Sequence, residues 1–207
     1  MRSAGLVLAG GSSRRLGRPK QLVSVGGEPL LQRVVGEACR SSLDEVWVIL
    51  GAHAEEIRAG VDLGRAQVVV NERHESGMAS SLRAGLAALD AGVERVVVIL
   101  GDQPDLEAGV VDALLELQLR GGRPAAALSF DGLLHPPVVM ARELWGGLES
   151  LEGDIGCRAI LRARPELVAA LPAPGGGRHP MDVDTPEDLE RVRAALSGHG
   201  AETRGPA

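Results

Sequence analysis

Short apolar runs alternate with amphipathic stretches along the first 120 residues, and this alternation limits the possible folds more than any other feature. The runs predict strands at 5–9, 45–50, 67–70 and 95–100, and the stretches between and after them predict helices at 29–40, 54–60, 77–89 and 106–120. Strands that are apolar on both faces and alternate with helices form a parallel sheet covered on both sides. The sequence therefore predicts a doubly wound α/β fold, with a mostly parallel sheet and helices on both faces.

The pattern is less regular after residue 122. Strands are predicted at 125–130, 138–140 and 167–171, and helices at 154–164 and 186–196, the last with Thr185 as its N-cap. Because no internal repeat or long linker interrupts the pattern, residues 1–197 are predicted to form a single domain. The composition of residues 198–207 predicts a disordered tail.

The predicted sheet also locates a ligand site. In an open α/β sheet, ligands bind at the carboxyl ends of the strands, beside the point where the strand order reverses. The segments that follow Ala9, Leu50, Val70 and Leu100 are therefore expected to converge on one crevice.

Charge and composition exclude several classes of protein. The net charge of −6 and the scarcity of aromatic residues (no Tyr, one Phe, two Trp) argue against a nucleic-acid binder or a protein of anionic membrane surfaces. Cys39 and Cys157 lack metal-site spacing and are expected to be reduced thiols. No signal peptide and no membrane-spanning apolar run is visible, so the expected compartment is the cytoplasm.

The segment after the first strand has the composition of a phosphate-binding loop. Gly10 and Gly11 allow backbone N–H groups to approach a ligand, and Ser12 and Ser13 add hydroxyl donors. Four basic residues follow within seven positions, in a protein that is acidic as a whole: Arg14, Arg15, Arg18 and Lys20. The spacing fits neither the P-loop nor the dinucleotide fingerprint. The alternative is a surface turn with solvated arginines.

Two carboxylates stand where a divalent cation could bind. Asp102 directly follows the fourth predicted strand, and Asp184 precedes the last predicted helix. Mg²⁺ prefers one or two carboxylates together with water and phosphate oxygens, so this pair is a candidate Mg²⁺ site. Two structural alternatives remain open: Asp102 could be a turn residue, and Asp184 could belong to a helix cap with Thr185 and Asp188.

The segment Leu-Ala-Gly-Gly-Ser-Ser-Arg-Arg-Leu-Gly, followed by Pro-Lys-Gln-Leu, resembles the first motif of the MobA-like nucleotidyltransferases. Segments 101–104, 153–158 and 182–188 resemble the later motifs, in the same order, and the nearest branch is molybdenum cofactor cytidylyltransferase. The resemblance implies a fold like that of the nucleotide-diphospho-sugar transferases. It also implies transfer of a nucleoside monophosphate from an NTP to a phosphorylated acceptor, the molybdopterin cofactor, with release of pyrophosphate. A molybdoenzyme or its chaperone is then an expected partner.

The resemblance also assigns roles to residues. It implies that Lys20 contacts the NTP phosphates and that Asp102 and Asp184 hold Mg²⁺. Lys20 and Arg15 are the expected catalytic cations, because an acceptor that is already anionic needs charge neutralisation rather than a general base. The expected nucleotide contacts are Leu8, Ala9, Gly10, Gly11, Ser12, Ser13, Lys20, Asn71, Gly77, Ser81 and Asp102.

The base and acceptor pockets are less sharply defined. Asn71 and Ser81 could instead be ordinary turn and helix-start residues. His135, Asp154 and Arg158 are the candidate acceptor contacts, although Asp154 and Arg158 could form an ion pair four residues apart on a helix.

The choice of nucleotide and the class of reaction each keep an alternative. Gly10 matches the guanylyl branch, whereas Pro19-Lys20-Gln21-Leu22 matches the cytidylyl branch; the later motifs favour CTP over GTP. The alternatives are a guanylyl or other nucleotidyltransferase with a different phosphorylated acceptor, and a redox enzyme that uses a nicotinamide cofactor.

Overall fold

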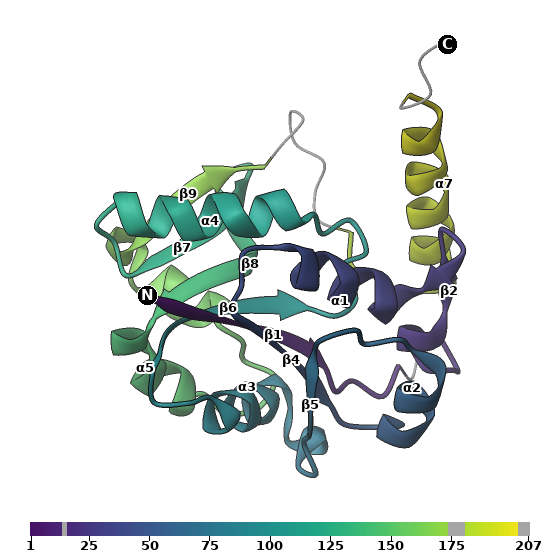
Figure 1. Cartoon of the computed structure of the whole chain (residues 1–207), viewed down its shortest axis with the longest axis horizontal. Helices are drawn as coiled ribbons and strands as arrows, with labels where there is room; N and C mark the ends of the chain where they lie inside the picture. The colour runs from purple at the N-terminus through teal and green to yellow at the C-terminus, as the bar shows by residue number, and fades with distance from the viewer. Residues whose placement is uncertain (14–15, 174–180, 203–207) are drawn as a thin grey trace.

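A computed structural model describes residues 1–13, 16–173 and 181–202, and its centre is a seven-stranded sheet (Figure 1). The strands lie in the order β5 (Gln67–Val70), β4 (Glu45–Leu50), β1 (Arg2–Ala9), β6 (Val93–Leu100), β8 (Leu133–Ala141), β7 (Ala125–Phe130) and β9 (Val168–Pro172). Within this sheet β8 runs antiparallel to both of its neighbours, and the other paired strands are parallel. The predicted α/β fold with a mostly parallel sheet is confirmed.

Helices cover both faces of the sheet (Figure 1). α1 (Leu30–Arg40) and α4 (Ala108–Arg120) pack on one face, whereas α3 (Met78–Ala88), α5 (Trp145–Glu149) and α6 (Arg158–Ala163) pack on the other. α2 (Ala54–Gly60) follows β4. The short elements are η1 (Lys20–Leu22), β2 (Ser24–Val25), β3 (Glu28–Pro29), η2 (His74–Ser76), η3 (Arg142–Leu144) and η4 (Pro165–Leu167).

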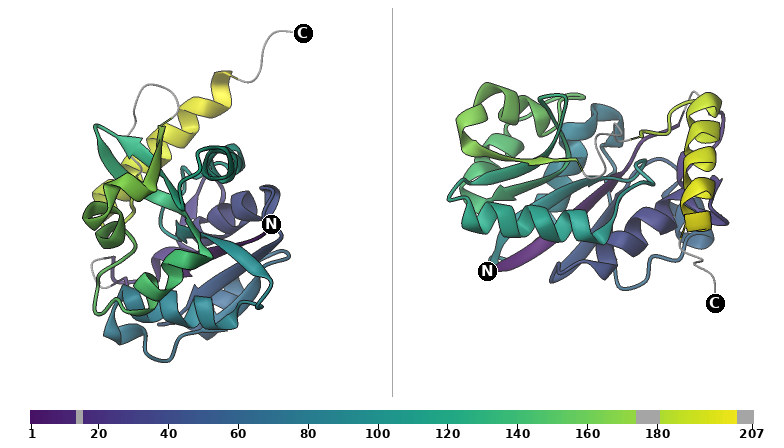
Figure 2. Two further views of the ribbon diagram at one scale, coloured as in Figure 1. Left: turned by 90° about the vertical axis from the view of Figure 1, so that its left-hand side faces the viewer. Right: turned by 90° about the horizontal axis from the view of Figure 1, so that it is seen from above.

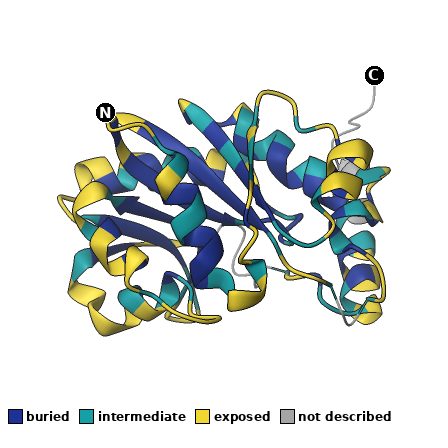
Figure 3. Cartoon of the chain, turned by 90° about the horizontal axis from the view of Figure 1, so that it is seen from below, coloured by how far each residue is buried: buried dark blue, intermediate teal, exposed yellow. Residues whose placement is uncertain are grey.

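The alternation of side chains along β1 builds two hydrophobic cores. Val7 and Ala9 belong to the cluster under α1 and α4, whereas Leu6 and Leu8 belong to the cluster under α3. Burial on both faces explains why this strand reads as a continuous apolar run in the sequence. Figure 3 shows the strands buried and the outer surfaces of the helices exposed.

β8 is longer than the predicted strand at 138–140, because two prolines interrupt the pattern without ending the strand. β7 and β8 form a hairpin closed by Asp131 and Gly132, which both have positive φ. The β7–β8 register shifts between Ala127 and Leu128, which leaves Pro136 and Pro137 outside the ladder. A bulge is where a strand tolerates residues without an N–H donor.

The two predicted C-terminal helices have different bounds in the structure. The helix predicted at 154–164 begins only at Arg158. A turn at Gly153, where φ is positive, and an irregular segment that packs on Met78 through Gly156 precede it. α7 (Pro186–Glu202) continues beyond the predicted end at 196, since no proline follows Pro186 until Pro206. Residues 198–202 of the predicted tail are therefore helical, and residues 203–207 lie outside the described residues.

α7 stands at one end of the molecule, next to the β2–β3 hairpin (Figures 1 and 2). The Arg193 guanidinium donates to the Ser24 carbonyl at 3.0 Å and ties the helix to this hairpin. Among the described residues, no helix combines the length and the apolar character needed to cross a bilayer.

Candidate active site

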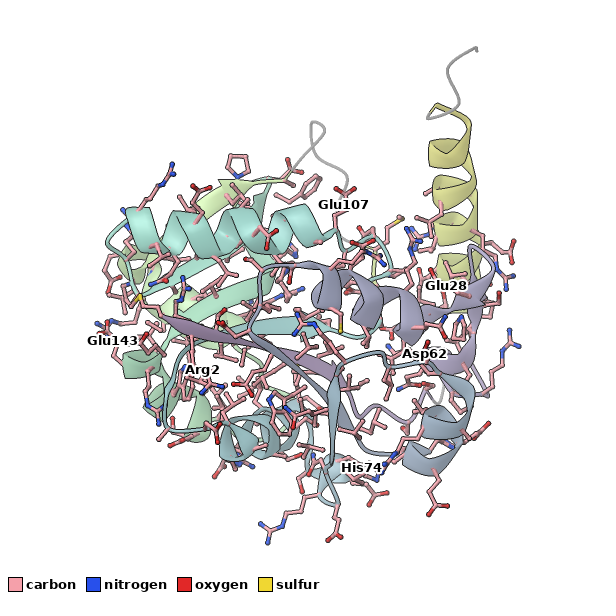
Figure 4. The ribbon with its side chains drawn as sticks, in the orientation of Figure 1. Arg2, Glu28, Asp62, His74, Glu107 and Glu143 are labelled. Atoms are coloured by element: carbon pink, nitrogen blue, oxygen red, sulfur yellow. The ribbon has the colours of Figure 1, made fainter. Side chains whose placement is uncertain are left out.

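A cleft of about 930 Å³ opens at the carboxyl ends of β1 and β6. Its lining includes Leu8, Ala9, Gly10, Gly11, Ser12, Ser13, Lys20, Ser81, Asp102 and Asp184. His74, labelled in Figure 4 below β5, also lines the cleft, so the segment after Val70 reaches it as well. The segment after Leu50 does not line the cleft itself. Its Gly51 packs against Gly10 and His74, which both do.

Lys20 joins three distant parts of the chain in this cleft. Its Nζ atom lies 2.5 Å from Oδ2 of Asp102 and 2.9 Å from Oδ1 of Asp184. Burial by itself lowers the pKa of Lys20, but the two carboxylates outweigh this effect and the pKa lies above its ordinary value. The lysine is therefore a permanent cation between two aspartates. It is also the single lysine of the 207-residue sequence.

A buried glutamine next to Lys20 fixes the shape of the glycine loop. Gln21 is 2% exposed, and its Nε2 donates to the carbonyl oxygens of Ala9 at 2.8 Å and Gly11 at 3.3 Å. The Ser13 hydroxyl accepts from the Lys20 backbone N–H at 3.0 Å and donates to Oε1 of Gln21 at 3.4 Å. The loop is therefore held in shape by contacts to Gln21 and to the Ser13 hydroxyl. Ser12, by contrast, is exposed.

Asp102 combines a paired and an unpaired carboxylate oxygen. Oδ2 meets Lys20, whereas Oδ1 is buried and accepts no hydrogen bond from any described residue. Burial raises the pKa of Asp102, with Lys20 acting against this rise and Asp182 and Asp184 adding to it. An unpaired buried oxygen beside further carboxylates is an environment that favours a cation.

Backbone and side-chain contacts hold Asp184 opposite Asp102. The Val183 N–H donates to the Asp102 carbonyl at 3.1 Å, and Nε2 of Gln103 donates to Oδ1 of Asp182 at 2.7 Å. Asp182 therefore lines the cleft beside Asp102 and Asp184, and Lys20 is the cation that contacts the latter two.

The donor set fits Mg²⁺ or Mn²⁺ bound together with a nucleotide. Among the described residues, no group of three or more His, Cys, Asp or Glu side chains is arranged as a metal site. A cation held by only two carboxylates keeps coordination positions for phosphate oxygens and water, which is the usual arrangement for Mg²⁺. Asp102 and Asp184 are the residues that would hold it.

The helix cap considered as an alternative role for Asp184 is made by other residues. Oδ2 of Asp188 accepts from the Thr185 N–H at 2.8 Å, and the Asp188 N–H donates to Oγ1 of Thr185 at 3.2 Å. Partial burial acts to raise the pKa of Asp188, but hydrogen bonds from Thr185 and Arg191 lower it to about 2. Because Asp188 makes the cap, the side chain of Asp184 is directed to Lys20 instead.

Asn71 does not line the cleft, contrary to the expectation that it contacts the base. It is 5% exposed, and its Nδ2 donates to the hydroxyls of Ser80 at 2.8 Å and Ser81 at 3.1 Å. Its Oδ1 accepts from the Arg73 N–H at 3.0 Å. The amide is turned inward because it joins the end of β5 to the first turn of α3, and it thereby positions Ser81, which does line the cleft.

Gly77 lines the cleft, but the group that packs closely against its backbone is Gly153, from another part of the chain. A Cβ atom on Gly77 would lie 2.3 Å from the carbonyl carbon of Gly153, and φ at Gly77 is +92°. The Ala79 N–H donates to the Gly153 carbonyl at 3.0 Å. Glycine is required here because the segment before α6 packs directly on the start of α3.

The three candidate acceptor residues differ in position. His135 is 4% exposed and does not line the cleft; its neighbour Pro136 does, because adjacent strand residues point to opposite faces. This corrects the assignment of His135 to the acceptor side. Asp154 and Arg158 both line the cleft. They do not form the helical ion pair considered as an alternative, since Asp154 precedes α6.

Arg15, predicted to be a catalytic cation, lies outside the described residues. Two residues that line the cleft, Gln21 and Arg162, were not predicted from the sequence. Gln21 lines the cleft directly after Lys20, and this adjacency is the signal that could have identified it. Gln103 does not line the cleft but donates to Asp182, which does. Arg162 lies one helical turn after Arg158, so helical periodicity could have added it to the cleft lining.

Comparison with known proteins connects this geometry to a family. The MobA-like NTP transferase domain matches residues 5–171 of the chain. A nicotine blue oxidoreductase of Paenarthrobacter nicotinovorans is 35% identical over 196 residues, with 91% of this chain and 95% of that protein covered. A molybdenum cofactor guanylyltransferase of Rhodobacter capsulatus is 36% identical over 207 residues, with 95% and 97% covered.

Solved structures agree with this relationship. The homologue of Mycobacterium tuberculosis Rv0371c from Mycobacterium sp. strain JC1 superposes with a TM-score of 0.85 at 32% identity, with 96% of this chain and 100% of that chain covered. Rv0371c of Mycobacterium tuberculosis H37Rv in complex with manganese superposes with a TM-score of 0.81 at 27% identity, with 94% and 100% covered. That solved structure contains a divalent metal, manganese.

Proposed function

Since the chain belongs to the MobA-like NTP transferase family, we propose that it transfers a nucleoside monophosphate from an NTP to a phosphorylated small molecule and releases pyrophosphate. The observation that carries this proposal is the position of Lys20. Its ammonium lies between Asp102 and Asp184 in a cleft whose rim is the Gly10-Gly11 loop. This arrangement offers a fixed positive charge and two metal-ligand carboxylates to a triphosphate.

The chemistry requires alignment and charge neutralisation more than proton transfer. An oxygen of the acceptor phosphate forms a bond to the α-phosphorus of the NTP. The bond from that phosphorus to the bridging oxygen breaks, and pyrophosphate leaves with the electron pair. The acceptor oxygen is already anionic at neutral pH. The raised pKa of Lys20 keeps its ammonium charged to neutralise the phosphate oxygens.

Asp102 and Asp184 are proposed to hold the divalent cation. The buried Oδ1 of Asp102, which accepts no hydrogen bond from a described residue, supports this assignment. When bound, the metal would withdraw charge from the phosphate oxygens and orient the triphosphate. Lys20 and Arg15 remain the proposed catalytic cations.

CTP is the favoured nucleotide and a molybdopterin-type cofactor the favoured acceptor. The Pro19-Lys20-Gln21-Leu22 segment supports CTP, whereas Gly10 and the guanylyltransferase relative support GTP. A Cβ atom on Gly10 would lie 3.1 Å from Oγ of Ser81, so a Gly10→Ala substitution would alter the cleft at this point. A molybdoenzyme or its chaperone is the proposed recipient of the product.

An oxidoreductase is the second candidate, and one observation favours it: a relative that is 35% identical bears that name. The absence of the dinucleotide fingerprint from the sequence weighs against a nicotinamide cofactor. Titration of the protein with NADH and NADPH, followed by fluorescence, separates the two classes.

The direct test measures pyrophosphate release with each of the four NTPs, Mg²⁺ or Mn²⁺, and a panel of phosphorylated acceptors. We expect release with one NTP that depends on both the acceptor phosphate and the metal. In Asp102→Asn, the half-saturating metal concentration should rise at least about tenfold, since a charged ligand is lost. Asp90→Asn, at an exposed site, is the control. Pyrophosphate release without added metal, or an unchanged metal requirement in Asp102→Asn, would refute the assignment.

A further inference from the structure

Two arginines on one face of α6 line the cleft without an ion-pair partner among the described residues. Arg158 and Arg162 are four residues apart, so their side chains leave the same face of the helix. Arg164, two residues further on, is different: its Nε lies 2.9 Å from Oε1 of Glu166, and it does not line the cleft. The charge at Arg164 is thus balanced by a neighbour, whereas the charges at Arg158 and Arg162 are not.

Two like charges one turn apart on a helix are unfavourable unless an anion lies between them. A guanidinium presents paired N–H donors that match the oxygens of a phosphate, and two such groups match a dianion. The four aspartates that line the same cleft are Asp102, Asp154, Asp182 and Asp184. Of these aspartates, Asp102 and Asp184 contact Lys20, and Asp182 accepts from Gln103. Glu75 is the fifth carboxylate of the lining, and among the described residues neither it nor Asp154 forms an ion pair with the α6 arginines.

Apolar side chains lie beside the two arginines. Met78, Pro136 and Ile155 line the cleft, and Ile155 is 50% exposed, which is unusual for an isoleucine. The segment that carries Ile155 is fixed against α3. A Cβ atom on Gly156 would lie 2.6 Å from Sδ of Met78, and the Arg83 guanidinium donates to the Leu151 carbonyl. This wall of the cleft is therefore a fixed surface of apolar atoms next to a doubly positive patch.

We propose that Arg158 and Arg162 bind the phosphate group of the acceptor, and that Met78, Pro136 and Ile155 contact its organic part. The ligand class is a phosphate monoester with an apolar body. The inference rests on the proposed nucleotidyl transfer and deepens it, because the two arginines offset the repulsion between the acceptor dianion and the triphosphate. Arg158 was already a candidate acceptor contact from the sequence. The proposal adds Arg162 as a second arginine that binds the same phosphate group.

Steady-state kinetics of Arg162→Gln and Arg164→Gln test the proposal. Loss of a charge-assisted hydrogen bond should raise the KM for the phosphorylated acceptor about tenfold or more in Arg162→Gln. The KM for the NTP and the kcat at saturating acceptor should stay within about twofold of wild type. The reason is that the lost contact binds the acceptor equally in the ground state and in the transition state. Arg164→Gln removes the same charge from the same helix end and should behave as wild type. Equal acceptor KM values in the two variants would overturn the proposal.

A binding measurement keeps the test independent of catalysis. Wild type and both variants are saturated with Mg²⁺ and a non-hydrolysable α,β-methylene NTP and titrated with inorganic phosphate by calorimetry. Wild type and Arg164→Gln should bind phosphate with equal affinity, and Arg162→Gln at least about tenfold more weakly. No phosphate binding by wild type, or equal binding by Arg162→Gln, contradicts the inference. If no NTP yields pyrophosphate but phosphate binds as expected, the transfer reaction fails and the arginine site stands.

Discussion

The two walls of the cleft differ in how their charged and polar groups are satisfied. On the wall built by the glycine loop, Lys20 contacts two aspartates and Gln21 donates to two loop carbonyls. On the wall built by α6, Arg158 and Arg162 have no carboxylate partner among the described residues. The first wall is organised by its own contacts before a ligand arrives. The second presents charges that only an anion from outside can balance.

This difference suggests a division of labour. Preorganised charges act in the transition state without reorganisation, so the loop wall suits the chemical step. Unpaired arginines at an open surface suit recognition of a substrate. Substitutions on the loop wall should therefore affect turnover and folding, whereas substitutions on the α6 wall should affect acceptor binding.

The largest expected effect is the loss of turnover when Lys20, on the loop wall, is substituted. Lys20→Met removes the cation while keeping a side chain of similar length, and turnover should fall by about 10²- to 10³-fold, the usual cost of losing one electrostatic contact to the transition state. Pyrophosphate release measures this loss. Arg40→Met, at an exposed cation on α1, is the matched control and should retain full activity. Full turnover in Lys20→Met would contradict the proposal that the loop wall carries the chemical step.

Because Lys20 is the single lysine, its ammonium can also be followed directly. Protein labelled with ¹⁵N-lysine should give one side-chain signal, and this signal should shift when metal and NTP are added together. The shift should be absent with the metal-free nucleoside of the same base, which lacks phosphates.

A smaller effect is expected at Gln21, which shapes the same wall without being proposed to touch the substrate. Gln21→Leu leaves the carbonyls of Ala9 and Gly11 without their donor, so the free energy of unfolding should fall by about 1–3 kcal/mol. The KM for the NTP should rise, while the KM for the acceptor should not. Thermal denaturation and kinetics measure both effects, with Gln67→Leu on the edge strand β5 as the control. A rise in the KM for the acceptor, with no change in the KM for the NTP, would contradict the proposal that the loop wall binds the nucleotide.

The smallest effect concerns Asp188, which caps α7 next to Asp184. Its pKa of about 2 lies below the ordinary value of 3.8, so its contribution to stability is complete above about pH 4 and is lost as the pH falls toward 2. Asp188→Asn should lower the free energy of unfolding by about 1 kcal/mol at pH 7 and by less near pH 2. Chemical denaturation at both pH values measures this difference. Glu190→Gln, on the exposed side of α7, should change little at either pH.

Much of the fold followed from local patterns. Continuous apolar runs located β1, β4, β5, β6, β7, β9 and the second half of β8, because the strands of a sheet covered on both sides carry apolar residues on both faces. Short elements were missed where the pattern is weak: α5 contains two glycines in five residues, and the prolines of β8 masked its first half. The two-residue strands β2 and β3 are too short to show a period.

By itself, the sequence determined that a glycine-rich basic loop follows the first strand and that Asp102 follows the fourth predicted strand, since both are properties of adjacent residues. Only the tertiary structure decided which side chains face the cleft. It brought Asp184 to Lys20 across 164 positions, turned Asn71 inward to Ser80 and Ser81, and packed Gly77 on Gly153. The direction of each of these side chains depends on contacts between segments that are far apart in the chain, and local patterns carry no record of such contacts.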